Sequence, residues 1–460
     1  MKILLCNPPA RGPGCVISPA LDIANLAGIT KEQGHVPVIE DLFVRFKADV
    51  RSNRLFLDQI ERHTKRAYGY IKGERPFLAL DHYAEKIASM IRHDDFDLAG
   101  FTINSLQQFP YTKLLSALCI SKKVKERAGA KVFLFGSFPQ NYSKLMIESF
   151  DIIDYVLVQD DGLSFRDMLK KERHEKHEKT FCYREGNRTI SPEGFNLGSL
   201  DDIPTPFFDK DVLKHYRHFG DVVLPYEVSR GCVNRCFFCY APLKGMGVRH
   251  KSLDKAISDI KSMHNEYGIS KFHFMDSEIN FDKDYILSFC RRLIETGIKF
   301  KWTALAVSKN LSKEDIQTLR KAGCVQLRWG IESGSRKILA TMDKNINIDE
   351  SKNILKICSE CSIKNHLSFI VGLPGETEKD MTDTMNFIKE NKEYIDSANV
   401  CPYNVLNHIT PLFFSDIDAY KKSLVSEDSM SRVSKARRLE DFMNEQGIFS
   451  LDIVDVVNDN

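Results

Sequence analysis

Three cysteines stand close together in this chain, in the order Cys232, Cys236 and Cys239. Their C-x3-C-x2-C spacing follows an apolar run that we expect to form a strand. Three thiolates on one short loop can ligate three irons of a [4Fe–4S] cluster, which leaves the fourth iron without a protein ligand. An iron of that kind is a position at which a small molecule can bind and receive an electron. The spacing therefore predicts a redox cluster with one open coordination position.

Other uses of these cysteines have less support. A structural zinc site needs four ligands, usually in paired knuckles, and the nearest histidine, His250, lies beyond a glycine-containing loop. The chain has 12 cysteines, and its N-terminal apolar run is too short for a signal peptide. We therefore expect a cytoplasmic protein in a reducing compartment, in which disulfides are disfavoured.

Length and composition describe an ordinary globular protein. The 460 residues suffice for two or three domains, with 43% hydrophobic and 28% charged residues. Lys and Arg number 65 and Asp and Glu 63, which gives a net charge of +2. This balance gives no bulk electrostatic reason to expect nucleic acid as a partner. No apolar stretch approaches the roughly 20 residues of a membrane-spanning helix.

Residues 1–170 alternate short apolar strands with helices, a pattern typical of an open, Rossmann-like parallel sheet. Between the second and third strands, residues 45–93 interrupt this alternation with a long, charged segment that we expect to be helical. Residues 171–221 are predicted to be a connector that contains a hairpin. The expected strands and main helices are Ile3–Cys6, Val36–Ile39, Leu98–Phe101, Val132–Phe135 and Tyr155–Val158, and Leu21–Gln33 and Ser116–Ala128.

A second α/β series is predicted over residues 222–410, followed by a helical C-terminal extension at 411–460. Its helices carry clear boundary signals, such as Ser312 with Asp315 at a helix start and Gly323 after the end. The six expected strands are Val222–Ser229, Lys271–Met275, Phe300–Ala306, Val325–Gly330, His366–Val371 and Asn399–Cys401.

Further motifs follow these strands. Glu332 and Ser333 follow the fourth, Gly372 to Gly375 follow the fifth, and residues 401–403 and 410–412 close the series. Together with the cysteine loop, these segments resemble the radical S-adenosylmethionine (SAM) superfamily from about residue 225 to 415. The resemblance implies a partial (βα)6 barrel rather than a closed eightfold barrel, with the cluster loop at its C-terminal face.

The resemblance also implies how SAM binds. The Phe238 backbone would approach the adenine, although a core aromatic is the alternative. Ser277 and Glu278 would accept from the SAM amino group; the usual Gly-Gly-Glu is absent, and a helix cap is the alternative. The remaining motifs would bind the ribose, the methionyl carboxylate and the adenine. The implied SAM-binding residues are Phe238, Ser277, Glu278, Glu332, Ser333 and Gly372.

For most cysteines outside the triplet we expect a structural role. Cys358 and Cys361 form a C-x-x-C on a predicted helix, and we expect two buried helix cysteines there rather than a second cluster. Cys324 is expected in the core at the mouth of the fourth strand. Cys401 is the candidate hydrogen-atom donor to a substrate radical, with a core cysteine as the alternative.

A Rossmann-like domain ahead of such a barrel resembles the cobalamin-binding subgroup of the superfamily. Residues 4–9, 19–26, 34–41 and 97–102 fit its pattern, and the implied cobalamin-binding residues are Ser105, Gly136 and Ser137. The sequence contains no D-x-H-x-x-G, a Gly-Ser pair replaces the usual Gly-Gly, and Gln-Asp-Asp-Gly at 159–162 replaces an acidic run. A domain that kept the sheet and lost the cofactor is therefore an alternative.

The resemblance implies reductive cleavage of SAM to a 5′-deoxyadenosyl radical, which removes hydrogen from the substrate. In this subgroup the expected outcome is cobalamin-dependent C-methylation of a small molecule or peptide, with an external electron donor such as flavodoxin or ferredoxin. The alternative is cobalamin-free epimerisation, cyclisation or oxidation, including that of a ribosomal peptide. A non-catalytic iron–sulfur sensor would need no SAM motifs, so the Glu332-Ser333 and Gly372 segments argue against it.

Overall fold

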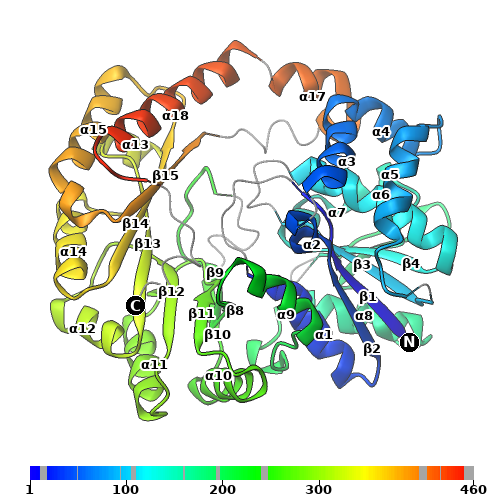
Figure 1. Cartoon of the computed structure of the whole chain (residues 1–460), viewed down its shortest axis with the longest axis horizontal. Helices are drawn as coiled ribbons and strands as arrows, with labels where there is room; N and C mark the ends of the chain where they lie inside the picture. The colour runs from blue at the N-terminus through cyan, green and yellow to red at the C-terminus, as the bar shows by residue number, and fades with distance from the viewer. Residues whose placement is uncertain are drawn as a thin grey trace. The chain divides into compact units, whose positions relative to one another are not determined.

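The chain separates into two compact units, Met1–Phe219 and Gly220–Asn460. The computed structural model describes residues 1–10, 18–48, 50–93, 95–104, 110–158, 161–192, 197–239, 247–403, 412–424 and 426–449. Each unit is built around its own largely parallel sheet, and the two sheets are coloured blue to cyan and green to orange in Figure 1.

The first unit contains a seven-stranded sheet in the order β2-β1-β3-β4-β5-β6-β7. Its first five strands are parallel, and the last two form an antiparallel hairpin that extends the edge of the sheet. The order 2-1-3-4-5 is that of flavodoxin-type doubly wound folds, so the predicted open parallel sheet is confirmed. The strands are β1 Lys2–Asn7, β2 Val36–Asp41, β3 Leu98–Thr102, β4 Lys131–Phe135, β5 Tyr155–Leu157, β6 Phe181–Glu185 and β7 Arg188–Ile190.

Helices cover this sheet and fill the predicted excursion at residues 45–93. In that excursion α3, α4 and α5 pack on α6, burying the apolar side chains of Phe56, Ile60, Leu80 and Ile87. Elsewhere in this unit, α1 packs beside α8. The helices are α1 Leu21–Glu32, α2 Leu42–Ala48, α3 Val50–Arg62, α4 Thr64–Ile71, α5 Leu78–Ala88, α6 Pro110–Ala128, α7 Ser137–Ser149, α8 Asp161–Glu172 and α9 Lys210–Tyr216.

The second unit contains a six-stranded sheet in the order β15-β14-β13-β12-β11-β8, and all its pairings are parallel. Consecutive strands are neighbours, as in a (βα) barrel, and helices α10 to α15 lie outside the curved sheet in Figure 1. The predicted partial (βα)6 barrel is therefore confirmed. The strands are β8 Leu224–Tyr226, β9 Ser229–Cys232, β10 Gly247–His250, β11 Lys271–Phe274, β12 Lys301–Ala306, β13 Cys324–Glu332, β14 Lys364–Val371 and β15 Ser397–Pro402.

Helix boundaries in this unit follow the sequence signals. Ser312 and Asp315 form a complete capping box at the start of α12, and Thr377 and Asp380 form another at the start of α15. After the barrel, α18 packs against β14 and β15. The helices are α10 Leu253–Tyr267, α11 Lys283–Glu295, α12 Lys313–Lys321, α13 Arg336–Thr341, α14 Ile348–Glu360, α15 Glu378–Asn391, α17 Ile417–Leu424 and α18 Glu427–Glu445.

The strands of the barrel have two different faces. Phe274 meets Phe289 of α11, and Phe369 meets Phe387 of α15, which identifies the outer, helix-covered face. Because side chains alternate along a strand, the intervening residues lie on the inner face of the barrel. The inner face carries many polar side chains, whereas the outer face is apolar.

The first barrel strand differs from the prediction. Instead of one strand over Val222–Ser229, the chain forms the short β8, breaks, and then forms β9, which pairs antiparallel with β10. The break occurs because the Asp276 carboxylate accepts from the amides of Val228 and Ser229, at 3.3 and 2.6 Å, so these amides leave the sheet. The cysteine loop therefore starts from a separate two-stranded ribbon.

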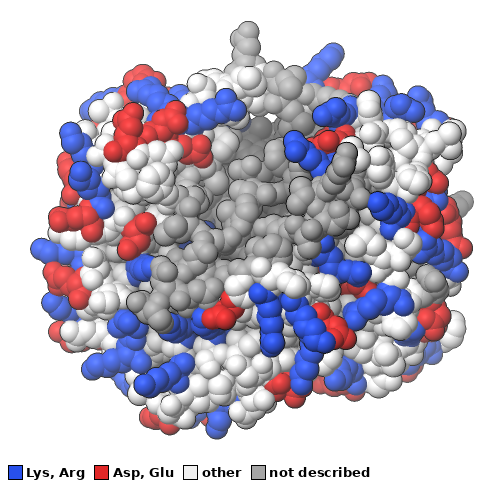
Figure 2. Space-filling model, viewed as in Figure 1, with Lys and Arg blue, Asp and Glu red and all other residues white. Residues whose placement is uncertain are grey.

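The surface carries charges of both signs. Figure 2 shows Lys and Arg interspersed with Asp and Glu on the visible face, in keeping with the net charge of +2. Within the described ranges, the structure contains no helix with the length and apolarity needed to span a bilayer.

Candidate functional site

The cysteine loop leaves the ribbon at Cys232, the last residue of β9, which pairs with Gly247 of β10. Gly231 has φ +100°, and a Cβ atom there would lie 2.3 Å from the Gly247 carbonyl oxygen, so only glycine fits. Cys236 is buried, whereas Cys232 and Cys239 are half-buried. The start of the cysteine loop is thus held tightly by the ribbon of β9 and β10. The thiols of the loop are partly accessible.

That base is fixed by Asp276, just past the end of β11. Its Oδ1 atom also accepts from the Ser229 hydroxyl at 2.5 Å, in addition to the two amides described above. Burial raises the pKa of Asp276 to about 7, against the opposing effect of these hydrogen bonds. Asp276 therefore connects the second barrel strand to the start of the cysteine loop.

Glu278 reaches the cysteine loop directly. Its Oε2 atom accepts from Asn234 Nδ2 at 2.7 Å and lies 3.8 Å from Cys232 Sγ. Glu278 is buried, whereas Ser277 is exposed. Of the predicted pair Ser277 and Glu278, only the Glu278 carboxylate lies next to the cysteine loop. The Ser277 side chain is exposed.

The loop after α13 holds the other half of the cysteine segment. The Phe237 amide donates to the Met342 carbonyl at 3.2 Å, and Cys236 Sγ lies 3.7 Å from the Asp343 carbonyl oxygen. Phe238 packs against a cluster of Ile338, Met342 and Leu373. Phe238 is therefore a half-buried aromatic beside this cluster, and through Leu373 it adjoins the fifth-strand motif.

Glu332 ends β13 in a left-handed backbone conformation, with φ +65°. Such a conformation is strained for a residue with a side chain, and it occurs next to a register shift between Gly330 and Glu332. The buried carboxylate pairs with Lys344 Nζ at 3.1 Å. A Cβ atom at Gly330 would lie 2.5 Å from Glu332 Oε1 and 2.7 Å from Lys344 Nζ, so a side chain at this position would displace the ends of both side chains.

Ser333 is turned into the protein. Its hydroxyl lies 3.1 Å from Thr384 Oγ1 and accepts from the Ser335 amide at 3.1 Å. Ser335 in turn donates to Asp380 at 2.7 Å, and Lys337 donates to the same carboxylate at 2.9 Å. These contacts join the starts of α13 and α15 and fix the turn that follows Glu332.

Gly372 follows β14 with φ +83°, and its amide donates to Glu376 Oε2 at 2.6 Å. A Cβ atom there would lie 2.5 Å from the side chain of Arg432 on α18. Burial raises the pKa of Glu376, which Lys435 partly opposes. The fifth-strand motif is therefore covered by α18, a contact that the sequence did not indicate.

These motifs match a known family. Residues 226–388 match the model of the radical SAM superfamily. This part of the chain is a radical SAM domain. It contains the cysteine triplet, the Glu332 turn and Gly372, so the chain is a radical SAM enzyme, and such a domain uses a [4Fe–4S] cluster and SAM.

Individual relatives extend the likeness beyond the radical SAM domain. The uncharacterized methyltransferase PH0819 of Pyrococcus horikoshii is 25% identical over 417 residues, which cover 88% of this chain and 81% of the relative. The cytidylyl-2-hydroxyethylphosphonate methyltransferase of Streptomyces wedmorensis is 25% identical over 217 residues, covering 44% of this chain. The matched part spans only 41% of that second relative.

A solved structure shows the same fold. The radical S-adenosylmethionine methyltransferase TsrM from Kitasatospora setae, with cobalamin and a [4Fe–4S] cluster bound, aligns with a TM-score of 0.63. The alignment covers 87% of this chain and 71% of that chain at 14% sequence identity. The aligned 87% of this chain is long enough to include residues of both units.

The donor set of the radical SAM domain fits an iron–sulfur cluster. Burial raises the pKa of the Cys232 and Cys236 thiols, and each of them also feels the charge of Cys239. Coordination to iron removes the proton from such a thiol. No group of three His, Cys, Asp or Glu side chains converges on a single ion anywhere in the described part of the chain. A cluster places each thiolate on a separate iron and so needs a wider arrangement.

The candidates in the first unit lie at the C-terminal edge of its sheet. Gly136 has φ +101°, and a Cβ atom there would lie 2.7 Å from Asn104 Oδ1, so the packing of the chain itself requires this glycine. The Ser137 amide donates to Asn104 at 3.4 Å. Ser105 lies outside the described residues.

The same edge includes the β1/β3 switch point, where open parallel sheets bind ligands. Within the described residues, the Oδ1 atom of Asn7, which is buried at the end of β1, has no hydrogen-bond partner. Its amide nitrogen donates to Asp41, at 3.1 Å from Oδ1. An orphaned acceptor at this position fits a polar ligand.

Cys401 lies half-buried on the inner face of β15, and Asn399 Nδ2 donates to its sulfur at 3.6 Å. Cys324 is buried at the start of β13, as expected. Cys358 is buried on α14, as expected, whereas Cys361 is the residue just after the helix and is half-buried rather than buried. The role of Cys401 as a hydrogen donor stays a prediction.

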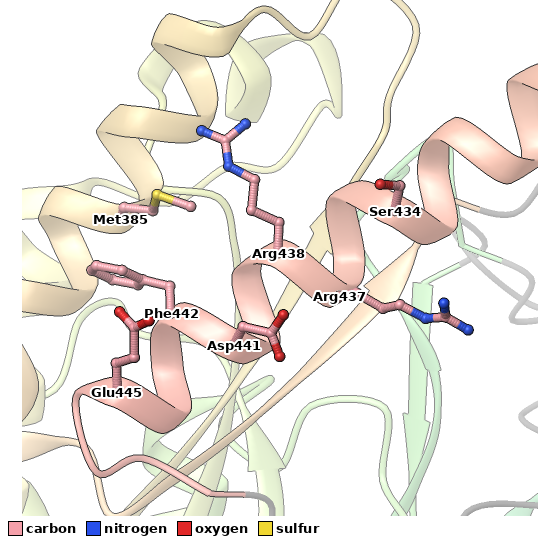
Figure 3. Close-up of a pocket in the computed structure, with 7 residues that line it drawn as sticks. All are labelled: Met385, Ser434, Arg437, Arg438, Asp441, Phe442 and Glu445. Atoms are coloured by element: carbon pink, nitrogen blue, oxygen red, sulfur yellow. The ribbon is translucent and has the colours of Figure 1, made fainter.

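A separate surface pocket of about 440 Å³ lies between α15 and α18. Figure 3 shows Met385 of α15 facing Phe442 and Glu445 of α18, while Arg437 points away from them. Arg438 is paired with Glu378 at 2.6 Å. None of the residues lining this pocket is a predicted site residue, so it is separate from the motifs of the radical SAM domain.

Sequence reasoning missed Lys344, Asn234 and Asp276. Asn234 lies inside the cysteine loop and Asp276 two residues before Glu278, so proximity to the motifs was a usable signal. Lys344 is twelve residues from Glu332 in sequence, and no local pattern indicates that the two side chains pair.

Proposed function

We propose that this radical SAM enzyme is a cobalamin-dependent C-methyltransferase. The observation that carries the radical SAM part is the convergence of three loops at one end of the barrel. The cysteine loop is bonded to the loop after α13 through Phe237 and Met342, and Phe238 packs on Leu373 of the fifth-strand motif. The cobalamin part is supported by the flavodoxin-type sheet and by the likeness to methyltransferases.

In this proposal Cys232, Cys236 and Cys239 hold the cluster, and Glu278, Glu332, Gly372 and Phe238 surround SAM. Ser333, whose hydroxyl is bonded to Thr384 and Ser335, fixes the turn after Glu332. When bound, the cluster supplies the electron that cleaves SAM to a 5′-deoxyadenosyl radical, and methylcobalamin supplies the methyl group. An external protein such as flavodoxin or ferredoxin delivers the electron.

The residues of the chain bind and orient the reactants. Glu332 is the acceptor suited to the ribose hydroxyls, and its pairing with Lys344 holds the carboxylate in one position. Gly372 belongs to the motif proposed to adjoin the adenine, and its missing Cβ makes room for Arg432. Gly136 and Ser137 lie at the edge where the cobalamin would be held. The substrate is a small molecule or a peptide.

The test uses protein made anaerobically with cobalamin supplied. We expect about one cobalt per chain, an absorbance spectrum of bound cobalamin, and a product heavier by one methylene. The result that contradicts the methyltransferase assignment is no cobalt beside a cluster that still cleaves SAM. That outcome would favour cobalamin-free chemistry, namely epimerisation, cyclisation or oxidation, because the radical half of the site would be intact.

A further inference from the structure

Asn234 lies between Cys232, a proposed cluster ligand, and Glu278, a proposed SAM ligand. Its side-chain Nδ2 atom donates to Glu278 Oε2 at 2.7 Å and to Cys232 Sγ at 3.5 Å. The amide nitrogen of an asparagine carries two N–H groups, so one Nδ2 atom can supply both hydrogen bonds at once. Asn234 therefore connects the two halves of the proposed site through a single group.

The backbone on either side of the Glu278 carboxylate is fixed by the neighbouring strand. The Ile279 amide donates to the Leu305 carbonyl of β12 at 2.8 Å. The Asn280 side chain accepts from the Val307 amide at 2.9 Å and donates to the Val307 carbonyl at 2.8 Å. Because the backbone is held in this way, the position of the Glu278 carboxylate depends on what its side chain contacts. Within the described residues its hydrogen bonds use Oε2, which leaves Oε1 for another donor.

The cysteine loop directs Asn234 into the site. Asn234 lies on the short segment between Cys232 and Cys236 and is half-buried. Its neighbour on one side, Val233, is 52% exposed, and its neighbour on the other side, Arg235, is also exposed. The loop therefore turns Asn234, rather than the residues beside it, toward Glu278.

Iron coordination would change the charge of this contact. In the structure the Cys232 thiol and Glu278 Oε2 lie 3.8 Å apart, with the thiol as the donor. A thiol that ligates iron has lost its proton, so the sulfur and the carboxylate would then be two negative groups that repel. The Asn234 amide donates to both groups, and hydrogen bonds to charged acceptors are the stronger ones. Asn234 therefore offsets this repulsion.

The same contact affects the uptake of an electron. The reduction potential of an iron–sulfur cluster depends on the hydrogen bonds to its sulfurs and on its net charge. A donor at a ligand sulfur stabilises the added negative charge and raises the potential, whereas a nearby carboxylate lowers it. Asn234 donates to the sulfur and also shares the charge of the carboxylate. Both effects favour reduction.

We propose that Asn234 is a positioning residue for the reductive cleavage of SAM, which holds the Glu278 carboxylate for the SAM amino group and, through Cys232, favours electron uptake by the cluster. This inference rests on the proposed function, because it assigns Asn234 to the same site. The electron comes from the external donor protein, and no bond to Asn234 forms or breaks. Glu278 Oε1 is the oxygen left for the amino group.

The first test measures the reduction potential of the full chain, reconstituted with its cluster anaerobically and without SAM, by redox titration with electron paramagnetic resonance. Asn234→Leu removes the donor and keeps a similar shape. At one fixed potential, the ratio of reduced to oxidised cluster should fall about three- to tenfold, which is roughly 30–60 mV for a one-electron couple. Asn234→Asp has the same shape with an acceptor in place of the donor, so the ratio should fall further.

The second test measures the Kd of SAM. Asn234→Leu should raise it about three- to tenfold, because the Glu278 carboxylate loses the donor that fixes it. Glu278→Gln should raise the Kd more, and the double variant should raise it less than the product of the two single effects. Single effects that simply multiply would mean that Asn234 does not act through Glu278, and would overturn this positioning role.

Val233→Thr is the matched control, since it changes an exposed side chain on the same loop. It should leave the reduced fraction and the Kd within about twofold of the unmodified protein. An unchanged potential in both Asn234 variants would overturn the effect on electron uptake. If Asn234→Leu does not take up iron, Asn234→Asp provides the measurement. Loss of the cluster from both, beside a normal iron content in Val233→Thr, would assign Asn234 to the folding of the loop and overturn the proposal.

Failure of the proposed function would give a different result. An unmodified protein that holds its cluster and does not cleave SAM would contradict the proposed function. The potentials of the unmodified protein and the Asn234 variants would still be comparable, because the titration contains neither SAM nor substrate. A lower potential in the variants would then support the effect of Asn234 on the cluster by itself.

Discussion

The C-terminal edges of the two sheets use charged residues in opposite ways. In the first unit, Asp41 at the end of β2 is sealed in, accepting from Tyr216, Val44 and Asn7 at 2.5, 3.0 and 3.1 Å. In the barrel, the half-buried thiols of Cys232 and Cys239 lie at the edge, beside the buried Glu332 that pairs with Lys344. Parallel strands determine where a site can form, and the two edges differ in that the barrel edge carries partly accessible thiols.

The largest effect is expected from Cys236→Ala. Removing one of three proposed cluster ligands should lower the iron content and reduce 5′-deoxyadenosine formation at least 100-fold. Cys361→Ala at the end of α14 is the matched control and should keep both. Iron analysis measures the iron content, and product chromatography measures 5′-deoxyadenosine formation. Retained SAM cleavage in the Cys236 variant would contradict the proposal that the thiols at the barrel edge hold the cluster.

Lys344→Met should have the next largest effect. It leaves the Glu332 carboxylate buried without its cation, which typically costs about 3–5 kcal/mol when a buried pair loses one partner. We expect weaker SAM binding and a lower free energy of unfolding, both measurable by titration and denaturation. Lys344→Met combined with Glu332→Gln should cost less than the sum of the single changes. Additive effects would mean that the pair is not coupled.

Two glycine changes compare the edges directly. Gly330→Ala pushes a methyl group into the Glu332–Lys344 pair, so SAM affinity should fall about tenfold. Gly136→Ala puts a side chain at φ +101°, which should cost roughly 1–3 kcal/mol of stability in the first unit. SAM cleavage should persist in the Gly136 variant. The opposite pattern, with SAM binding lost only in Gly136→Ala, would contradict the assignment of the SAM site.

The smallest effect concerns pH. Burial raises the pKa of Asp276 to about 7, above the roughly 3.9 of an unfolded aspartate, so the folded state binds this proton more tightly. The contribution to the free energy of unfolding is therefore greatest below about pH 4 and falls as the pH rises to 7. Asp276→Asn should reduce that fall by about 1–3 kcal/mol. Denaturation at pH 5 and pH 7.5 measures it, and an equal pH dependence in both proteins would refute it.

Local patterns predicted the barrel elements because each is specified by neighbouring residues. The apolar alternation of β12 and β14 and the Ser312 capping box depend on residues a few positions apart. The interruption between β8 and β9 was not predictable in this way. It depends on Asp276, which is 47 residues from Ser229 in the chain.

The sequence by itself determined the reactive groups, namely three thiols on one loop and the motif residues Glu332 and Gly372. It also determined the two α/β series. Only the tertiary structure decided which partners these groups have. It brought Lys344 to Glu332, Arg432 over Gly372 and Asn234 to Glu278. The physical reason is that pairing energies depend on distance and burial, and both are set by strand register and helix packing rather than by sequence spacing.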